Sequence, residues 1–396
     1  MSDKVIMAFK TRLNVNNKQS DFLFKCVNVR RVAFNFALGT WKEMYQAYKL
    51  DETKPKPSAF DIDKIFNSCK KDKYPWMYDS NGKLIVPSCV GQEAIKSDIK
   101  FAFNNFFSRV KKGAKPGYPK FKKRGFSESF KLTSTVLNNN HVIGNKVNLP
   151  KGYGTAKLGD PLPDGVIKNT TISYRAGKWW ISFLLESDRN DYCSPSSAIG
   201  IDVGVKRFAT LSDGTYFNSA KALENGSAKL TKLQRQLSKM TKGSNRYKEQ
   251  KNKISKLHKK ISDIRVNHAH QISSQIAQNH NVIVIEDLKL SNMTKSSKGT
   301  IDKPGKKVSQ KSGLNKTLLN QGLYEFRRQL EYKAEKYYGK VIAVDPAYTS
   351  QTCNCCGHVS KENRKSQSVF KCVSCGHEDN ADVNAAKNIL QKALAA

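Results

Sequence analysis

Residues 349–360 read TSQTCNCCGHVS and residues 372–390 read CVSCGHEDNADVNAAKNIL. Each stretch holds one Cys-x-x-Cys pair followed directly by Gly and His. Structural Zn²⁺ sites take four thiolates at the corners of a tetrahedron, and a glycine permits the tight turn that such a pair needs. The repeat therefore predicts a structural Zn²⁺ site whose ligands are Cys353, Cys356, Cys372 and Cys375.

Other residues in this stretch are alternatives to the four ligands. Cys355 lies inside the first pair, but the repeated Cys-Gly-His order favours Cys356. His358 and His377 follow the two pairs, yet four thiolates already fill a structural site. Disulfides are the remaining alternative, and we expect a reducing compartment instead, because the N-terminus reads as no secretory signal. Lone cysteines fit that expectation, and they are Cys26, Cys69, Cys89 and Cys193.

The chain carries a large excess of positive charge over nearly its whole length. Its 396 residues include 69 Lys and Arg against 33 Asp and Glu, a formal net charge of +36. Such an imbalance predicts a large polyanionic partner, most simply nucleic acid. No apolar run approaches the length of a membrane-spanning helix, so we predict no membrane partner and a cytoplasmic, nucleoid-associated protein. The length gives room for roughly two to four domains.

The first half of the chain reads as a helical region within a β-rich one. Residues 4–13 read as a strand, whereas 27–48 and about 90–110 place apolar residues at the spacing of packed helices. Short alternating runs separated by Gly and Pro at 130–187 predict a small barrel or sheet. We expect the strand at 4–13 to join that sheet, which makes the helical region an insertion. A linker rich in Ser, Asp and Pro follows at 187–197.

A basic segment with interleaved aromatic residues follows the second helical pattern. It reads RVKKGAKPGYPKFKKRGFSESFKL at 109–132. Lysines around aromatic rings suit a track for phosphates and bases, while a solvated loop or a targeting signal are the alternatives. We predict nucleic-acid contacts for a group of four cations, which are Lys120, Lys122, Lys123 and Arg124.

The second half alternates between strands and helices. Residues 198–219 predict three hairpin-linked strands, and apolar runs at 281–290 and 340–350 predict two more buried strands. Leucines and isoleucines at 229–279 repeat by three and four, which predicts a basic helical hairpin with a coiled-coil seam. Residues 291–317 are rich in Lys, Ser and Gly and predict a mobile basic loop, followed by a helix.

Three acidic residues stand where these elements begin or end. Asp202 and Glu286 each close an apolar strand, and Asp382 opens the terminal helix. Phosphodiester hydrolysis by two metal ions needs such a set, because Mg²⁺ prefers carboxylate oxygens and an ion pair holds the attacking and leaving oxygens. One such acid alone would more often be a cap or a surface charge, whereas the joint pattern is rare. The sequence predicts catalytic, Mg²⁺-binding acids at these three positions.

Neighbouring acids compete for the same roles. Asp345 also ends a strand, but the proline after it predicts a turn. Asp379 lies in the exit from the cysteine motif, which we expect to be flexible. Strand alternation predicts that Asp287 points away from Glu286.

The chain resembles the TnpB family, transposon-encoded RNA-guided DNA endonucleases related to type V CRISPR effectors. The segments that carry the resemblance are GIDVGVKRFATLSDG (200–214), VIVIEDLKLSNM (282–293), FRRQLEYKAEKYYGKVIAVDPAYTSQTC (326–353), CVSCGHEDNADVNAAKNIL (372–390), FNFALGTW (34–41) and GYPKFKKR (117–124). One departure concerns the last acid: family members often read Asp-Arg-Asp there, whereas this chain has Asn380 and Ala381 between Asp379 and Asp382.

The resemblance implies a multidomain α+β architecture with a RuvC/RNase H-like nuclease domain, an inserted zinc ribbon, a β-barrel wedge domain and a helical recognition domain. The implied bounds are 1–13 and 120–190 for the wedge domain, 14–119 for the recognition domain, 197–350 and 379–396 for the nuclease domain, and 351–378 for the zinc ribbon.

The resemblance also implies a function and partners. We expect an Mg²⁺-dependent endonuclease that takes a guide RNA from the transposon end and acts on double-stranded DNA beside a short adjacent motif, as a monomer with one RNA. It implies catalytic roles for Asp202, Glu286 and Asp382. Three alternatives stay open: a nuclease-inactive guided repressor, a compact type V CRISPR effector, and a zinc-ribbon transcription factor that would leave the three acids without a role.

Overall fold

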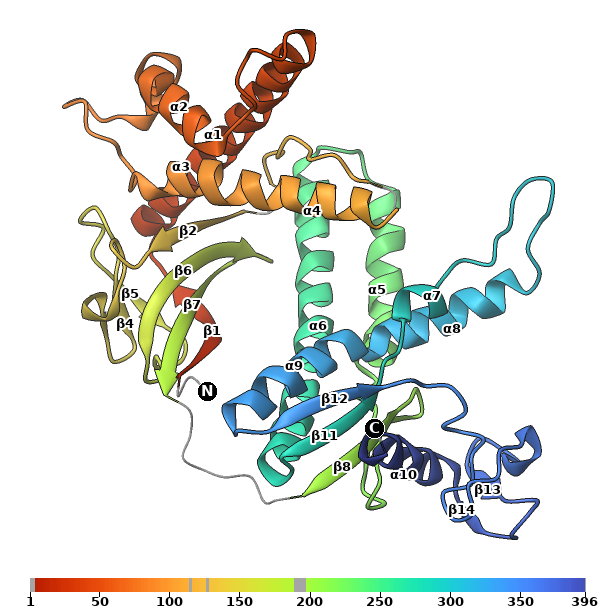
Figure 1. The fold of residues 1–396 in the computed structure, drawn as a ribbon. Coiled ribbons are helices and arrows are strands. Elements are labelled where there is room, and N and C mark those ends of the chain that lie inside the picture. Colours follow the sequence, from red (N-terminus) through yellow and green to blue (C-terminus); the bar gives the residue numbers. More distant parts are fainter. Residues whose placement is uncertain (1–3, 114–115, 126–127, 189–196, 396) are drawn as a thin grey trace. The chain divides into compact units, whose positions relative to one another are not determined.

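The protein has a multidomain α+β fold. The structure, a computed structural model, describes residues 4–113, 116–125, 128–188 and 197–395 (Figure 1). Its backbone contacts divide the chain into two compact units, one at Lys4–Asp188 and one within 189–396. Cys193 and most of the predicted linker at 187–197 lie outside the described residues.

The N-terminal unit contains a seven-stranded antiparallel sheet in the order β2-β6-β7-β1-β5-β4-β3. Its strands are β1 (Lys4–Asn14), β2 (Ser129–Thr133), β3 (Val142–Ile143), β4 (Lys146–Asn148), β5 (Thr155–Leu158), β6 (Val166–Arg175) and β7 (Lys178–Asp188). Strand β1 pairs with β7 from Lys4 opposite Asp188 to Leu13 opposite Trp179. The prediction that the first strand joins the later β-rich segment is therefore confirmed.

Helices occupy the chain between β1 and β2. They are α1 (Asn17–Leu50), α2 (Ala59–Lys73), α3 (Cys89–Glu93) and α4 (Lys100–Lys111), with a π-helical turn at Ala94–Ile99 and a 3₁₀ turn at Pro75–Met77. Helix α1 begins with a capping box, because the side chains of Asn16 and Gln19 each accept from the other's backbone N–H. In α4 the side chain of Phe103 is buried and stacks on Trp41, whereas that of Phe107 is 51% exposed.

The C-terminal unit contains a five-stranded mixed sheet in the order β10-β9-β8-β11-β12. Its strands are β8 (Ala198–Val203), β9 (Arg207–Leu211), β10 (Tyr216–Asn218), β11 (Val282–Glu286) and β12 (Lys340–Val344). Strands β8, β11 and β12 run parallel, while β9 and β10 run antiparallel to their neighbours. The three hairpin-linked strands are confirmed. The prediction that β12 is buried is wrong: it is an edge strand, and its residues are at most half-buried.

The helices of this unit are α5 (Ala222–Ser238), α6 (Asn245–Asn279), α7 (Leu290–Met293), α8 (Val308–Gln321), α9 (Leu323–Lys336) and α10 (Ala381–Leu394). Helices α5 and α6 form the predicted hairpin, with Ile254 and Ile261 buried. The predicted loop at 291–317 is partly wrong, because α8 occupies its end. That helix has no fully buried residue, so it lacks the apolar periodicity by which sequence patterns reveal helices.

A close approach places the terminal helix against the central strand. Helix α10 packs on β8, and a side chain added at Gly200 would come within 2.1 Å of the Ala386 carbonyl oxygen. Only glycine fits at this position, because any Cβ would collide with the helix backbone. This contact brings the first turn of α10 toward the end of β8.

Candidate metal and carboxylate sites

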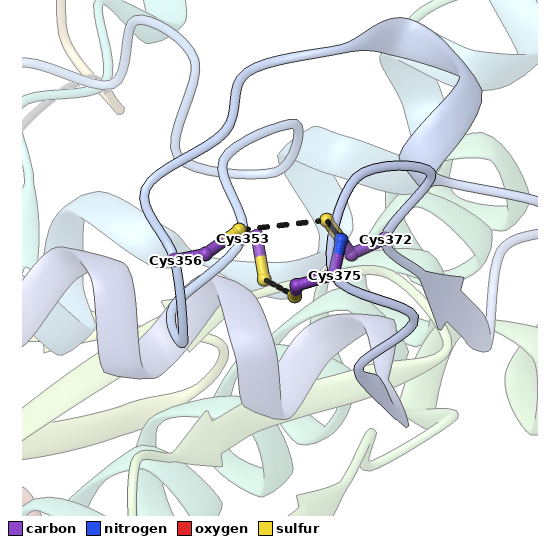
Figure 2. Close-up of side chains that lie close together, drawn as sticks. All are labelled: Cys353, Cys356, Cys372 and Cys375. Atoms are coloured by element: carbon purple, nitrogen blue, oxygen red, sulfur yellow. Dashed lines mark hydrogen bonds between the residues drawn. The ribbon is translucent and has the colours of Figure 1, made fainter.

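The structure brings together the four cysteines that the repeated motif singled out. The Sγ atoms of Cys353 and Cys375 lie 3.7 Å apart, and those of Cys356 and Cys372 lie 3.6 Å apart (Figure 2). All four sulfur atoms lie within 4.8 Å of one another. This is the compact all-thiolate arrangement that a tetrahedral Zn²⁺ site requires. Cys355 is exposed and lies outside the set.

The two cysteine turns have the same backbone geometry. The Cys353 N–H donates to the His358 carbonyl and the Cys372 N–H to the His377 carbonyl, each at 2.9 Å. Gly357 and Gly376 have φ of 75° and 73°, a left-handed conformation that explains the glycine in each motif. The residues around these turns form a short two-stranded ribbon, β13 (Val369–Lys371) with β14 (Glu378–Asn380).

Two buried asparagines of helix α10 bind it to the segment that holds the first cysteine pair. The Asn384 side chain donates to the Thr352 carbonyl at 2.8 Å and accepts from the Asn354 N–H at 3.0 Å. One turn later, Asn388 donates to the carbonyls of Thr349 and Thr352 at 2.9 and 2.6 Å. Because Asn384 is fully buried, loss of these bonds would leave buried polar groups unpaired. The segment around the first cysteine pair therefore fixes the helix that carries Asp382.

The three predicted acids lie at neighbouring ends of their elements. Asp202 is near the end of β8, Glu286 is the last residue of the adjacent β11, and Asp382 is in the first turn of α10. Burial and, after it, the charges of Glu286 and Asp382 together raise the pKa of Asp202 to about 7. Asp202 is thus close enough to Glu286 and to Asp382 for the charge of each to oppose its ionisation.

Glu286 is held by a hydrogen bond from the segment that leads into the ribbon. The Thr349 hydroxyl donates to Glu286 Oε1 at 2.6 Å. Burial raises the pKa of Glu286, and this hydrogen bond opposes the rise. A divalent cation would relieve both the repulsion and the desolvation of these acids, so the donor set suits a hard ion such as Mg²⁺. The acids form a looser group than the thiols: among the described residues, the four cysteines are the only group of three or more whose ligand atoms all lie within 4.8 Å of one another.

The sequence analysis missed Arg364, which stands beside the last acid. Its Nη2 atom lies 3.5 Å from Asp382 Oδ1, and its charge lowers the pKa of Asp202. This arginine belongs to the insert between the two cysteine pairs, eighteen positions before Asp382. Arg364 therefore places a positive charge beside Asp382. The insert offered no periodicity that could have singled it out.

The competing acids have other partners. Asp379 pairs with Lys387 at 2.8 Å and lies in β14, so the prediction of a flexible exit there is wrong. Asp345 accepts from the Ala347 N–H in a turn, and Asp287 pairs with Arg327 at 2.8 Å.

The predicted basic contact residues do not behave alike. Lys120, Lys123 and Arg124 are exposed. Lys122 instead lies 3.4 Å from Asp98, and burial lowers its pKa to about 8. Its backbone N–H also donates to the Asn35 side chain, so Lys122 fastens the basic loop to helix α1.

Comparisons with known proteins identify the family. A family model described as "Probable transposase" matches residues 183–297, one described as "Cas12f1-like, TNB domain" matches 324–389, and one described as "Helix-turn-helix domain" matches 1–49. The chain is 40% identical over 388 residues to "Putative RNA-guided DNA endonuclease InsQ" of Escherichia coli, covering 98% of this chain and 92% of that one. It is 30% identical to a "Putative RNA-guided DNA endonuclease" of Streptomyces pristinaespiralis, over 78% of this chain and 73% of that one.

The C-terminal region has a more local relative. Over 72 residues the chain is 50% identical to "CRISPR-associated endodeoxyribonuclease Cas12f1" of Sulfoacidibacillus thermotolerans, which covers 18% of this chain and 17% of that one. The full-length matches decide the assignment: the chain belongs to the TnpB family. Among the described residues, every helix is too short or too polar to pass through a lipid bilayer.

Proposed function

We propose that this chain is an RNA-guided DNA endonuclease with one RuvC-like site built from Asp202, Glu286 and Asp382. The position of Asp202 near the charges of Glu286 and Asp382 carries the proposal, since these acids come from remote segments of the chain. The strand order, with three antiparallel strands followed by two parallel ones, supports an RNase H-like nuclease domain. Family membership and the charge of +36 support a nucleic-acid substrate and guide.

Different residues of the two sites would have different roles in this reaction. Asp202, Glu286 and Asp382 would hold Mg²⁺, which supplies an activated water and stabilises the leaving oxygen. Thr349 orients Glu286, and Arg364 places a positive charge where the scissile phosphate would add negative charge. The four cysteines would hold Zn²⁺ with a structural role, because their closed set leaves no position for a substrate.

The remaining domain roles follow the same proposal. The seven-stranded sheet would form the wedge domain and the helices between β1 and β2 the recognition domain, with a guide RNA from the transposon end as partner. The exposed Lys120, Lys123 and Arg124 would contact phosphates, whereas Lys122 would act by positioning their loop. Guide pairing would then select the target beside a short adjacent motif.

The test is guided cleavage by the purified full-length chain. RNA that copurifies with it is sequenced, and the complex is mixed with Mg²⁺ and plasmids that do or do not match that RNA. We expect cleavage of the matching plasmid only, and its loss in Asp202→Ala. Binding of the matching plasmid without cleavage by the unmodified chain would instead establish a guided repressor. Heterogeneous copurifying RNA would contradict the guide.

A further inference from the structure

A cavity of about 290 Å³ opens beside Glu286 in the C-terminal unit. Its floor is apolar: Ile285, Phe326 and Leu330 are all at most 5% exposed. Leu288 and Leu290, which follow β11, form one side. Tyr324, with a side chain 73% exposed, stands among the lining residues where α9 begins. The cavity therefore joins a buried apolar floor to an accessible aromatic ring.

The charges around this cavity are already paired. Arg327 contacts Asp287 at 2.8 Å and Glu331 at 2.9 Å. Arg328 contacts both oxygens of Glu325, at 2.9 and 2.6 Å. Because acids neutralise both guanidinium groups, the cavity does not suit a phosphate. A flat, mostly apolar group with polar edges suits it better, since the floor can stack while the rim donates and accepts hydrogen bonds.

We propose that this cavity holds one unpaired nucleobase of the DNA strand that is being cut. The inference rests on the proposed function, because Glu286 is both a wall of the cavity and one of the three acids. A strand whose phosphate lies at the acids has its neighbouring base within reach of this wall. Seating that base would fix the phosphate in position and would require the strand to be unpaired at the cut.

The first experiment scans the target for dependence on single bases. Guide-loaded protein is given matched DNAs in which one abasic position moves across the cut region. We expect one position beside the cut to slow cleavage roughly tenfold, the size of effect that base–aromatic stacking supports. In Leu290→Trp the new side chain fills the cavity. This variant should cut intact DNA as slowly as the unmodified protein cuts the abasic DNA, and the abasic position should not lower its cleavage rate further. Tyr338→Ala, an exposed tyrosine outside the cavity lining, should keep the full sensitivity.

Equal sensitivity at all positions, or sensitivity that persists in Leu290→Trp, would overturn the proposal. A second measurement does not need cleavage. Single strands with 2-aminopurine at one position are bound to the full-length Asp202→Asn protein, and stacking in the cavity should quench the fluorescence. The quench should disappear in Tyr324→Ala and Leu290→Trp backgrounds. Quenching by Asp202→Asn together with no cleavage by the unmodified guide-loaded chain would contradict the nuclease and keep the base site. Absence of quenching at every position would overturn the base site alone.

Discussion

The four-cysteine site and the three-acid site are joined by helix α10, yet they are built in opposite ways. The cysteines lie within 353–375 and are placed by two identical local turns. The acids extend from 202 to 382 and are placed by sheet order and by one helix contact at Gly200. In the metal-free protein the charges of Glu286 and Asp382 oppose the ionisation of Asp202. A site made by residues close together in the sequence can thus hold in place a helix that contributes to a second site, whose residues are far apart in the sequence.

The largest expected effect comes from breaking the cysteine site. In Cys372→Ser the Zn²⁺ content should fall from about one per chain to near zero, because a structural site needs all four ligands. The ribbon should unfold, since structural Zn²⁺ contributes on the order of 10 kcal/mol to such folds. Cleavage should be lost with it, because Asp382 loses its support. Metal analysis and cleavage assays check this, with the exposed Cys355→Ser as the matched control that retains both.

In the cysteine site a substitution should lower both stability and cleavage. In the acid site a substitution should lower cleavage but raise stability. Asp202→Asn should reduce cleavage by roughly 10³-fold or more, because a charge that binds metal is removed. It should also stabilise the metal-free protein at pH 8, by up to roughly 4 kcal/mol, since one pKa unit corresponds to about 1.36 kcal/mol. Denaturant unfolding of both proteins measures this. A destabilised Asp202→Asn protein would contradict the repulsion on which the comparison depends.

The same shift predicts a pH dependence for the unmodified protein without metal. The pKa of Asp202 rises from 3.8 in the unfolded chain to about 7 in the folded one, so the folded state binds the proton more tightly. The contribution of Asp202 to stability is complete below pH 3.8 and is lost as pH rises through about 7. The Asp202→Asn variant should lack this component, which thermal melts at successive pH values can show.

The link between the two sites is open to a smaller perturbation. Asn384→Ala removes two hydrogen bonds between α10 and the segment of the first cysteine pair, which should cost about 2–3 kcal/mol. Zn²⁺ should remain bound, because the four thiols are intact, while cleavage should fall. Asn354→Ala is the matched control. Asn354 contributes backbone groups to this link, its N–H to Asn384 and its carbonyl to Gln391, so the variant should cleave normally. Full cleavage by Asn384→Ala would show that these hydrogen bonds do not connect the cysteine site to the function of the acid site.

The smallest expected effect concerns Arg364. Its charge lowers the pKa of Asp202, so Arg364→Gln should raise that pKa. The pH at which cleavage reaches half its maximum should therefore move upward, with a reduced maximal rate. An unchanged pH profile would show that the arginine does not act on the acids.

The sequence predicted those parts of the fold that local patterns specify. Cys-x-x-Cys-Gly-His identifies a turn directly, and strands that end in Asp202 and Glu286 could be read from apolar runs. Arg364 could not be predicted, because its contact with Asp382 depends on how the insert folds back through space. The burial of Lys122 could not be predicted for the same reason, since its partner Asp98 lies on a helical turn that is far from it in the sequence. Helix α8 lacked a buried face, so no periodicity marked it.

The central claim is that Asp202, Glu286 and Asp382 together hold divalent cations. It can be tested by locating Mn²⁺, a substitute for Mg²⁺, through its anomalous scattering in crystals of the full-length chain. We predict ions between these three carboxylates and none there in crystals of Asp202→Asn. Ions bound elsewhere, with the three carboxylates left without metal, would contradict the account.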